Sequence, residues 1–206
     1  GGIVVQAVLG GITVLTQLNP WIVAAHFLIS GIMIFVAALM FQRVRLQYLH
    51  GAEAALVDGP TTSGSRLVAW VAFIALWFSV VLGTMVTGTG PHSGDAEAVR
   101  HGFNAELITR LHVVPVYVLV AAALILLVSV LRRPATSAAQ RRSTLWLLAV
   151  IILQGAIGYY QHFNGLPVLA VALHMLGSTA SIVAVTVAWQ RQVSRYQTRP
   201  AVAAAI

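Results

Sequence analysis

Long apolar runs alternate with short polar segments along the whole chain of 206 residues. Six runs approach the length of a membrane span, namely residues 2–18, 20–42, 66–88, 107–131, 143–162 and 167–190. A helix rises about 1.5 Å per residue, so about 20 apolar residues are needed to cross roughly 30 Å of hydrocarbon. The pattern therefore predicts an all-α integral membrane protein with six transmembrane helices.

The composition agrees with this pattern and excludes an ordinary soluble domain. Hydrophobic residues make up 59% of the chain and charged residues only 8%, whereas soluble domains carry about 25% charged residues. The first run lacks a positively charged start, so it does not have the form of a cleavable signal peptide. The given sequence contains no cysteine, which excludes disulfides and thiolate metal sites within it.

All twelve basic residues are arginines, and their distribution follows the membrane pattern rather than that of a nucleic-acid-binding protein. If six helices alternate in direction, ten of them lie on one side: Arg43, Arg45, Arg66, Arg132, Arg133, Arg141, Arg142, Arg191, Arg195 and Arg199. The other side holds Arg100 and Arg110. Because cytoplasmic loops carry the excess of basic residues, we expect a cytoplasmic C-terminus, an outer loop at residues 87–106, contact with membrane lipid and no nucleic-acid partner.

Three histidines lie inside the predicted helices. His26, His112 and His174 all occur within the first few turns of helices that enter the membrane from the outer side. Ionisable residues are costly in hydrocarbon, so each marks a candidate functional site. A hydrogen bond to a neighbouring helix is the alternative role for any one of them, but their shared depth favours a common function. Of the histidines at loops or helix ends, His162 is expected to be solvated, with a third ligand role as the alternative.

A shift of 148 residues aligns the first two apolar runs with the last two. The matching polar and glycine positions are Gln6 with Gln154, Gly10 with Gly158, His26 with His174, Ser30 with Ser178, and Gln42 with Gln190. Matched helices that run in the same direction indicate parallel repeats. The second repeat is a complete four-helix unit, whereas the first lacks its first two helices. We therefore expect an eight-helix protein of two parallel four-helix bundle repeats, with two helices preceding Gly1.

His112 and His174 belong to the second and fourth helices of the complete unit, which are diagonal in a bundle built in chain order. Two inward imidazoles at similar depth can hold a flat iron macrocycle between them. Two histidine ligands suit electron transfer, because no coordination position stays open. Zinc and copper sites usually need three or four ligands, and no carboxylate cluster supplies them here. Small residues such as Gly158 and Gly177 would make room for the macrocycle or merely allow close helix packing.

Several other residues have weaker signals, each with an alternative. Arg110 could bind a haem propionate or extend to the membrane interface as an exposed cation. Gln154 could bond a propionate, orient a ligand histidine or join two helices. Asn104 and Glu106 have the pattern of a helix N-cap followed by an acid that the helix dipole favours.

Four segments resemble bacterial haem A synthase, and together the resemblance covers nearly all of residues 1–190: "QAVLGGITVLTQLNPWIVAAHFLIS", "VLGTMVTGTGPHSGD", "ELITRLH" and "LQGAIGYYQHFNGLPVLAVALHML". The resemblance implies a bacterial plasma-membrane enzyme that oxidises the C8 methyl group of haem O to a formyl group, giving haem A for cytochrome oxidase. It implies that His112 and His174 ligate haem b and that His26 binds the iron of the substrate haem O. It also implies haem O synthase and the cytochrome oxidase assembly machinery as partners.

The chain departs from the family in its first half. The family's first two helices and first outer loop have no counterpart here, and with them are missing a second substrate-haem histidine, a catalytic glutamate and a cysteine pair of some members. The catalytic residue is therefore expected upstream of Gly1. The expected domains are 1–43, a helix pair of the substrate half; 44–65, a cytoplasmic linker; 66–191, the haem b bundle; and 192–206, a cytoplasmic tail. Two other functions stay open, a b-type cytochrome that only carries electrons and a transporter whose histidines couple protons.

Overall fold

The computed structural model describes residues 1–50, 61–91, 95 and 97–193, and these residues form six α-helices. The helices are α1 (Gly2–Leu15), α2 (Pro20–His50), α3 (Ser63–Thr89), α4 (Ala105–Leu131), α5 (Ala138–Phe163) and α6 (Val168–Val193). Helices α2 to α6 are long and apolar enough to cross a membrane. The chain is thus an all-α, multi-pass membrane protein, as its apolar pattern predicted.

Some helix ends differ from the expected ones. Helix α1 has 14 residues, which is about 21 Å of rise and short of a bilayer core, so five described helices rather than six reach spanning length. Helix α2 continues to His50, beyond the predicted start of the linker at 44, because no glycine or proline interrupts it before Gly51. Residues 51–60 of that linker and 194–206 of the expected tail lie outside the described residues.

Local capping explains why α3 and α5 begin earlier than their apolar runs. At α3, the hydroxyl of Thr62 accepts a hydrogen bond from the Ser65 backbone N–H at 3.1 Å, and the Ser65 hydroxyl accepts one from the Thr62 N–H. Ser137 and Gln140 form the same reciprocal arrangement at α5. Such capping boxes satisfy the first free N–H groups of a helix. The polar first turns therefore belong to the helices, although hydropathy alone does not show it.

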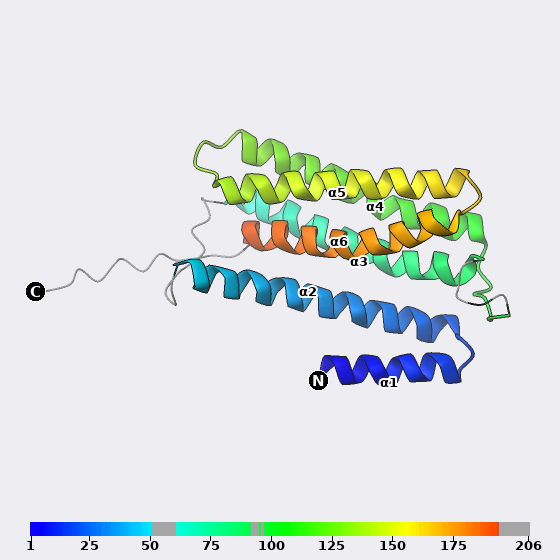
Figure 1. Ribbon diagram of the computed structural model, residues 1–206. Helices are drawn as coiled ribbons and strands as arrows, with labels where there is room; N and C mark the ends of the chain where they lie inside the picture. Colours follow the sequence, from blue (N-terminus) through cyan, green and yellow to red (C-terminus); the bar gives the residue numbers. More distant parts are fainter. Residues whose placement is uncertain (51–60, 92–94, 96, 194–206) are drawn as a thin grey trace, which may run out of the picture.

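Helices α3 to α6 form a four-helix bundle, and their axes run side by side in Figure 1. Helix α3 packs on α4 and α6, and α5 also packs on α4 and α6. Consequently α4 and α6 are diagonal, as expected for the helices that bear His112 and His174. The core combines small and aliphatic side chains, among them Ala72, Ala123, Leu147 and Ile182, each at most 2% exposed. Small residues let membrane helices approach closely.

The hairpin of α1 and α2, hereafter the first hairpin, lies outside this bundle. Helix α2 contacts α3 and α6, whereas α1 contacts α2 on its far side (Figure 1). Phe35 of α2 joins an aromatic cluster with Phe73, Trp77 and Trp189 of the bundle, with ring centroids 5.5, 6.4 and 6.3 Å away. No residue of α1 is buried, so the hairpin is attached through one face of α2.

The hairpin of α5 and α6, the second hairpin, repeats the first one even in its backbone. Leu18 and Leu166, which are 148 residues apart, both have positive φ, 57° and 58°, and the residues before them do too. The Leu18 N–H donates to the Thr13 carbonyl at 2.9 Å, and the Leu166 N–H donates to the Gln161 carbonyl at 2.8 Å. The left-handed region is uncommon for leucine. The two turns therefore share the same backbone conformation at the spacing of the sequence repeat. The repeat is present in the course of the backbone as well as in the matched side chains.

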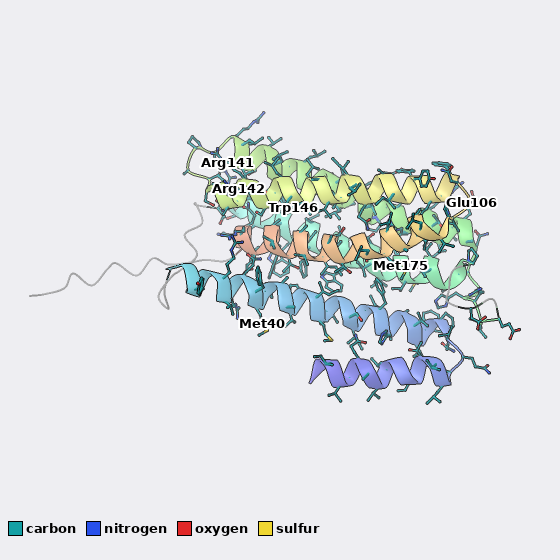
Figure 2. The ribbon with its side chains drawn as sticks, in the orientation of Figure 1. Met40, Glu106, Arg141, Arg142, Trp146 and Met175 are labelled. Carbon is teal, nitrogen blue, oxygen red and sulfur yellow. The ribbon has the colours of Figure 1, made fainter. Side chains whose placement is uncertain are left out.

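The two ends of the bundle carry different charges. Arg141 and Arg142 lie at one end and Glu106 lies at the other (Figure 2). The first of these, hereafter the Arg-rich end, comprises the ends of α2, α4 and α6 and the starts of α3 and α5. There the guanidinium of Arg133 donates to the Thr62 hydroxyl at 2.8 Å and ties the α4–α5 connection to α3. His26, His112 and His174 all lie nearer the opposite, Arg-poor end.

Candidate functional site

Three histidines, His26, His112 and His174, each face a glycine of the helix before their own. The pairs are His26 with Gly10, His112 with Gly83, and His174 with Gly158. A Cβ atom added at Gly83 or Gly158 would lie 3.2 Å from the Cε1 atom of the imidazole, and one at Gly10 would lie 3.6 Å away. Each ring thus packs against a stretch of backbone that carries no side chain. At Gly83 and Gly158, an added methyl group would be closer to the ring than an ordinary van der Waals contact allows.

The His112 ring has a defined tautomer. Its Nδ1 atom lies 2.9 Å from the backbone carbonyl oxygen of Ser79, one turn before Gly83 on α3. Because a carbonyl only accepts, Nδ1 carries the proton and donates, which leaves the Nε2 lone pair free. Metal-binding histidines commonly donate their other ring N–H in this way, since the bond fixes the tautomer and the ring plane.

His174 is held by the equivalent positions of α5. Gly158 lies beneath its ring, and the ring's Nδ1 atom is buried without a hydrogen-bond partner among the described residues. The side-chain Nε2 of Gln154 donates to the His174 backbone carbonyl at 2.8 Å. Gly177 gives that amide its room, because a Cβ there would overlap with it. Helix α5 therefore positions both the backbone and the ring of His174.

His112 and His174 lie on diagonal helices of the same bundle. Both side chains are partly buried. No group of three or more His, Asp or Glu side chains that could enclose a metal ion occurs in the part of the chain that the structure describes. A haem iron has four ligands from its macrocycle and needs only two from the protein. The donor set of two imidazoles, one with its Nε2 left free, fits this requirement.

His26 repeats the arrangement of His174 outside the bundle. The Gln6 amide donates to the His26 backbone carbonyl at 3.2 Å and to the Ser30 hydroxyl at 2.9 Å. The Nδ1 atom of His26 is buried without a partner among the described residues. Its ring lies against α1 rather than between α4 and α6. The structure thus places His112 and His174 on diagonal helices of one bundle and His26 outside that bundle.

The remaining candidates lie at the surface of the Arg-poor end. Arg110 forms an ion pair with Glu106 one turn earlier, and the two side chains are 75% and 71% exposed. Asn104 caps α4 by accepting from the Leu107 N–H at 2.9 Å, so the predicted N-cap is confirmed. His162 is exposed, as expected, and packs edge-on against Phe163. A contact between Arg110 and a propionate stays a prediction.

The bundle glycines allow close packing between helices, which is one of the two roles expected from the sequence. Gly158 makes room for an imidazole and Gly177 for a glutamine amide, and a contact with a macrocycle stays a prediction. The sequence reasoning missed Ser79 and Gly83, although their spacing of four residues equals that of Gln154 and Gly158. That shared spacing is the signal that could have revealed the neighbours of His112.

Comparisons with family models, curated proteins and solved structures give no match to this chain.

Proposed function

We propose that this chain is part of a haem A synthase in which the α3–α6 bundle holds haem b between His112 and His174. One observation carries the proposal: the Nδ1–H of His112 is fixed by the Ser79 carbonyl, which leaves Nε2 available on the helix diagonal to that of His174. The resemblance of the sequence motifs supplies the reaction, oxidation of the C8 methyl group of haem O to a formyl group. A multi-pass membrane protein suits this apolar substrate.

The chain's own residues have distinct roles in this proposal. His112 and His174 would hold the haem b iron; the Ser79 carbonyl orients the ring of His112, and the Gln154 amide holds the backbone of His174. Haem b held in this way would supply electron transfer, because two histidine ligands leave no coordination position open. His26, whose backbone Gln6 holds, would be one ligand of the substrate haem. Both bundle imidazoles are partly buried, and the surroundings of an iron held there would affect its reduction potential.

The Arg-rich end faces the cytoplasm in this proposal, by the positive-inside rule. The three histidines then lie in the outer half of the bacterial plasma membrane. Haem O arrives from a haem O synthase, and haem A passes on to cytochrome oxidase assembly.

Spectra and pigment extraction of the purified full chain test the proposal. We expect a low-spin b-type signal that disappears in His112→Ala and in His174→Ala, while the matched variant His162→Ala keeps it because that side chain is exposed at the end of α5. Extracted pigments should include haem O or haem A beside haem B. An unchanged b-type signal in both bundle variants would refute the ligand assignment.

The same imidazole pair favours a second candidate, a b-type cytochrome that only passes electrons, because two histidine ligands suit that chemistry by themselves. Extraction of haem B alone, with the ligand variants behaving as described above, would select it. A folded chain without any haem absorbance would exclude both and leave the transporter, whose histidines would couple protons.

A further inference from the structure

Four arginines flank the connection between α4 and α5 at the Arg-rich end. These connection arginines are Arg132, Arg133, Arg141 and Arg142. Arg132 and Arg142 are exposed, whereas Arg133 and Arg141 are half-buried. Figure 2 shows Arg141 and Arg142 where α5 begins. The cluster lies at the end of the bundle away from the three histidines, so the haem proposal does not use it.

Two of these guanidinium groups are fixed by neutral acceptors. Arg133 donates from Nη2 to the Thr62 hydroxyl at 2.8 Å and from Nη1 to the Ser65 hydroxyl at 3.4 Å. Arg141 donates from Nη2 to the backbone carbonyl of Arg133 at 3.3 Å. Hydroxyl and carbonyl oxygens hold a guanidinium in place without cancelling its charge. Because a guanidinium has five N–H groups, Arg133 keeps further donors beside the two that these bonds use.

No carboxylate balances the connection arginines within the part of the chain that the structure describes. The described acidic residues are Asp95, Glu97 and Glu106, and all three lie at the Arg-poor end. Helices α3 and α5 begin at the Arg-rich end without an acidic residue in their first turns, so the positive ends of their dipoles add to the arginine charge. The described part of this end is therefore positively charged and carries exposed N–H donors, which suit an anion.

The apolar surface beside the cluster indicates the class of anion. Trp146 follows Arg142 by one turn on α5, and Val128 precedes Arg132 by one turn on α4, so each shares a helix face with its arginine. The two apolar side chains are 68% and 47% exposed, and Figure 2 shows Trp146 farther along α5 than Arg142. Tryptophan is favoured where lipid headgroups meet hydrocarbon. An exposed cation followed by an exposed apolar face matches the headgroup and acyl chains of a lipid better than a soluble anion.

We propose that one anionic phospholipid binds across the α4–α5 connection, with its phosphate accepting hydrogen bonds from the connection arginines and its acyl chains lying along Trp146 and Val128. Arginine binds phosphate oxygens through paired N–H groups, and basic clusters at the ends of membrane helices bind anionic headgroups. The fixed guanidinium of Arg133 gives this site a defined geometry, which a diffuse attraction between a basic surface and an anionic membrane lacks. The inference does not depend on the proposed function.

Brominated lipids test this site in vesicles that contain the purified full chain, because bromine on an acyl chain quenches an indole that it contacts. Trp146 is the reporter, and the part of the quenching that disappears in Trp146→Phe is assigned to it. We expect brominated phosphatidylglycerol to be preferred at this position over brominated phosphatidylcholine by at least about fivefold, which corresponds to one arginine near a membrane surface.

Substitutions separate a defined site from a diffuse effect of charge. Arg142→Gln should remove most of the preference for phosphatidylglycerol. Arg43→Gln is the matched control, because it removes the same charge from an exposed position at the same Arg-rich end, on a helix that does not pack on α4 or α5. This control should keep the preference. Thermal unfolding checks the fold of each variant, and if Arg142→Gln does not fold, Arg132→Gln makes the same test at the end of α4.

Three results would each overturn the proposal: equal quenching by the two brominated lipids, an unchanged preference in a folded Arg142 or Arg132 variant, or an equal loss of preference in Arg43→Gln. Inorganic phosphate supplies a fourth test. A preference that phosphate abolishes, while chloride at equal ionic strength does not, would identify a site for a soluble phosphate instead of a lipid.

Discussion

The first and second hairpins have the same local design but different surroundings. Each presents a histidine above a glycine of the preceding helix, and in each a glutamine amide holds the histidine backbone. In the second hairpin, α5 and α6 pack against α4 and α3, and α4 carries a second imidazole, that of His112, on the helix diagonal to α6. In the first hairpin, α1 contacts only α2 among the described helices and has no buried residue. Both hairpins therefore carry a histidine in the same local setting. Only the second hairpin packs on a helix, α4, that carries another histidine within the bundle.

The largest expected effect separates His174 from its repeat counterpart His26. His174→Ala should abolish the low-spin b-type absorbance of the purified chain, whereas His26→Ala should keep it, because His26 lies outside the bundle. Reduced-minus-oxidised spectra measure the difference, and added imidazole should partly restore the signal of the His174 variant. Equal losses in the two variants would contradict a bundle-specific site.

Substitution of the glycine beneath each imidazole by alanine should distinguish the bundle histidines from His26. Gly158→Ala and Gly83→Ala place a Cβ at 3.2 Å from the ring, and Gly10→Ala places it at 3.6 Å. Overpacking costs about 1–3 kcal/mol, or about 5- to 150-fold in affinity, so haem occupancy should fall in the two bundle variants and stay near that of the parent in Gly10→Ala.

Haem titration of the purified chain measures that occupancy. Gly155→Ala is the matched control on α5, because nothing lies within 4 Å of a Cβ there. Occupancy that falls as far in Gly155→Ala as in Gly158→Ala would show that the ring contact is not the cause.

The glutamine of each hairpin should contribute a smaller and unequal amount of stability. Gln154→Leu removes the 2.8 Å bond to the His174 carbonyl and should lower the free energy of unfolding by about 0.5–1.5 kcal/mol. Gln6→Leu should lower it less, since α1 has no buried residue. Denaturant unfolding in detergent tests this order, and a larger effect at Gln6 would reverse our account of the two hairpins.

The smallest expected effect is a pH dependence at His101, whose ring packs on Trp21 of the first hairpin. Burial lowers the pKa of His101 below its ordinary value of 6.5. As the pH falls through 6.5, the unfolded chain takes up a proton that the folded chain does not bind until its lower pKa, so stability declines over that window.

Thermal unfolding midpoints at about pH 7.5 and about pH 5.5, on either side of the ordinary histidine pKa, measure this decline. His101→Phe keeps a ring against Trp21 and removes the titrating group, so its profile should be flatter than that of the parent. A profile identical to the parent's would show that another group is responsible.

Part of this structure could be predicted from the chain's pattern alone. The spans, the Arg asymmetry, the Asn104 cap and the diagonal placement of His112 and His174 follow from hydropathy, charge and helix order. The extension of α2 to His50 was not predicted. The polar residues after 42 lower the hydropathy there, but the segment up to residue 50 contains no glycine or proline and keeps its helix propensity. The burial of His101 was not predicted either, because its environment comes from residues on α2 and α3 that are distant in sequence.

The sequence by itself determined the all-α membrane architecture, since apolar runs of bilayer length can satisfy their backbone only as helices, and it determined the repeat of Gln, Gly and His in the two hairpins. Only the tertiary structure decided which carbonyl fixes the His112 ring, which glycine lies beneath each imidazole and which residues bury the His101 ring. These are contacts between different helices or loops, and they depend on rotation and depth, which the periodicity of a single helix does not specify.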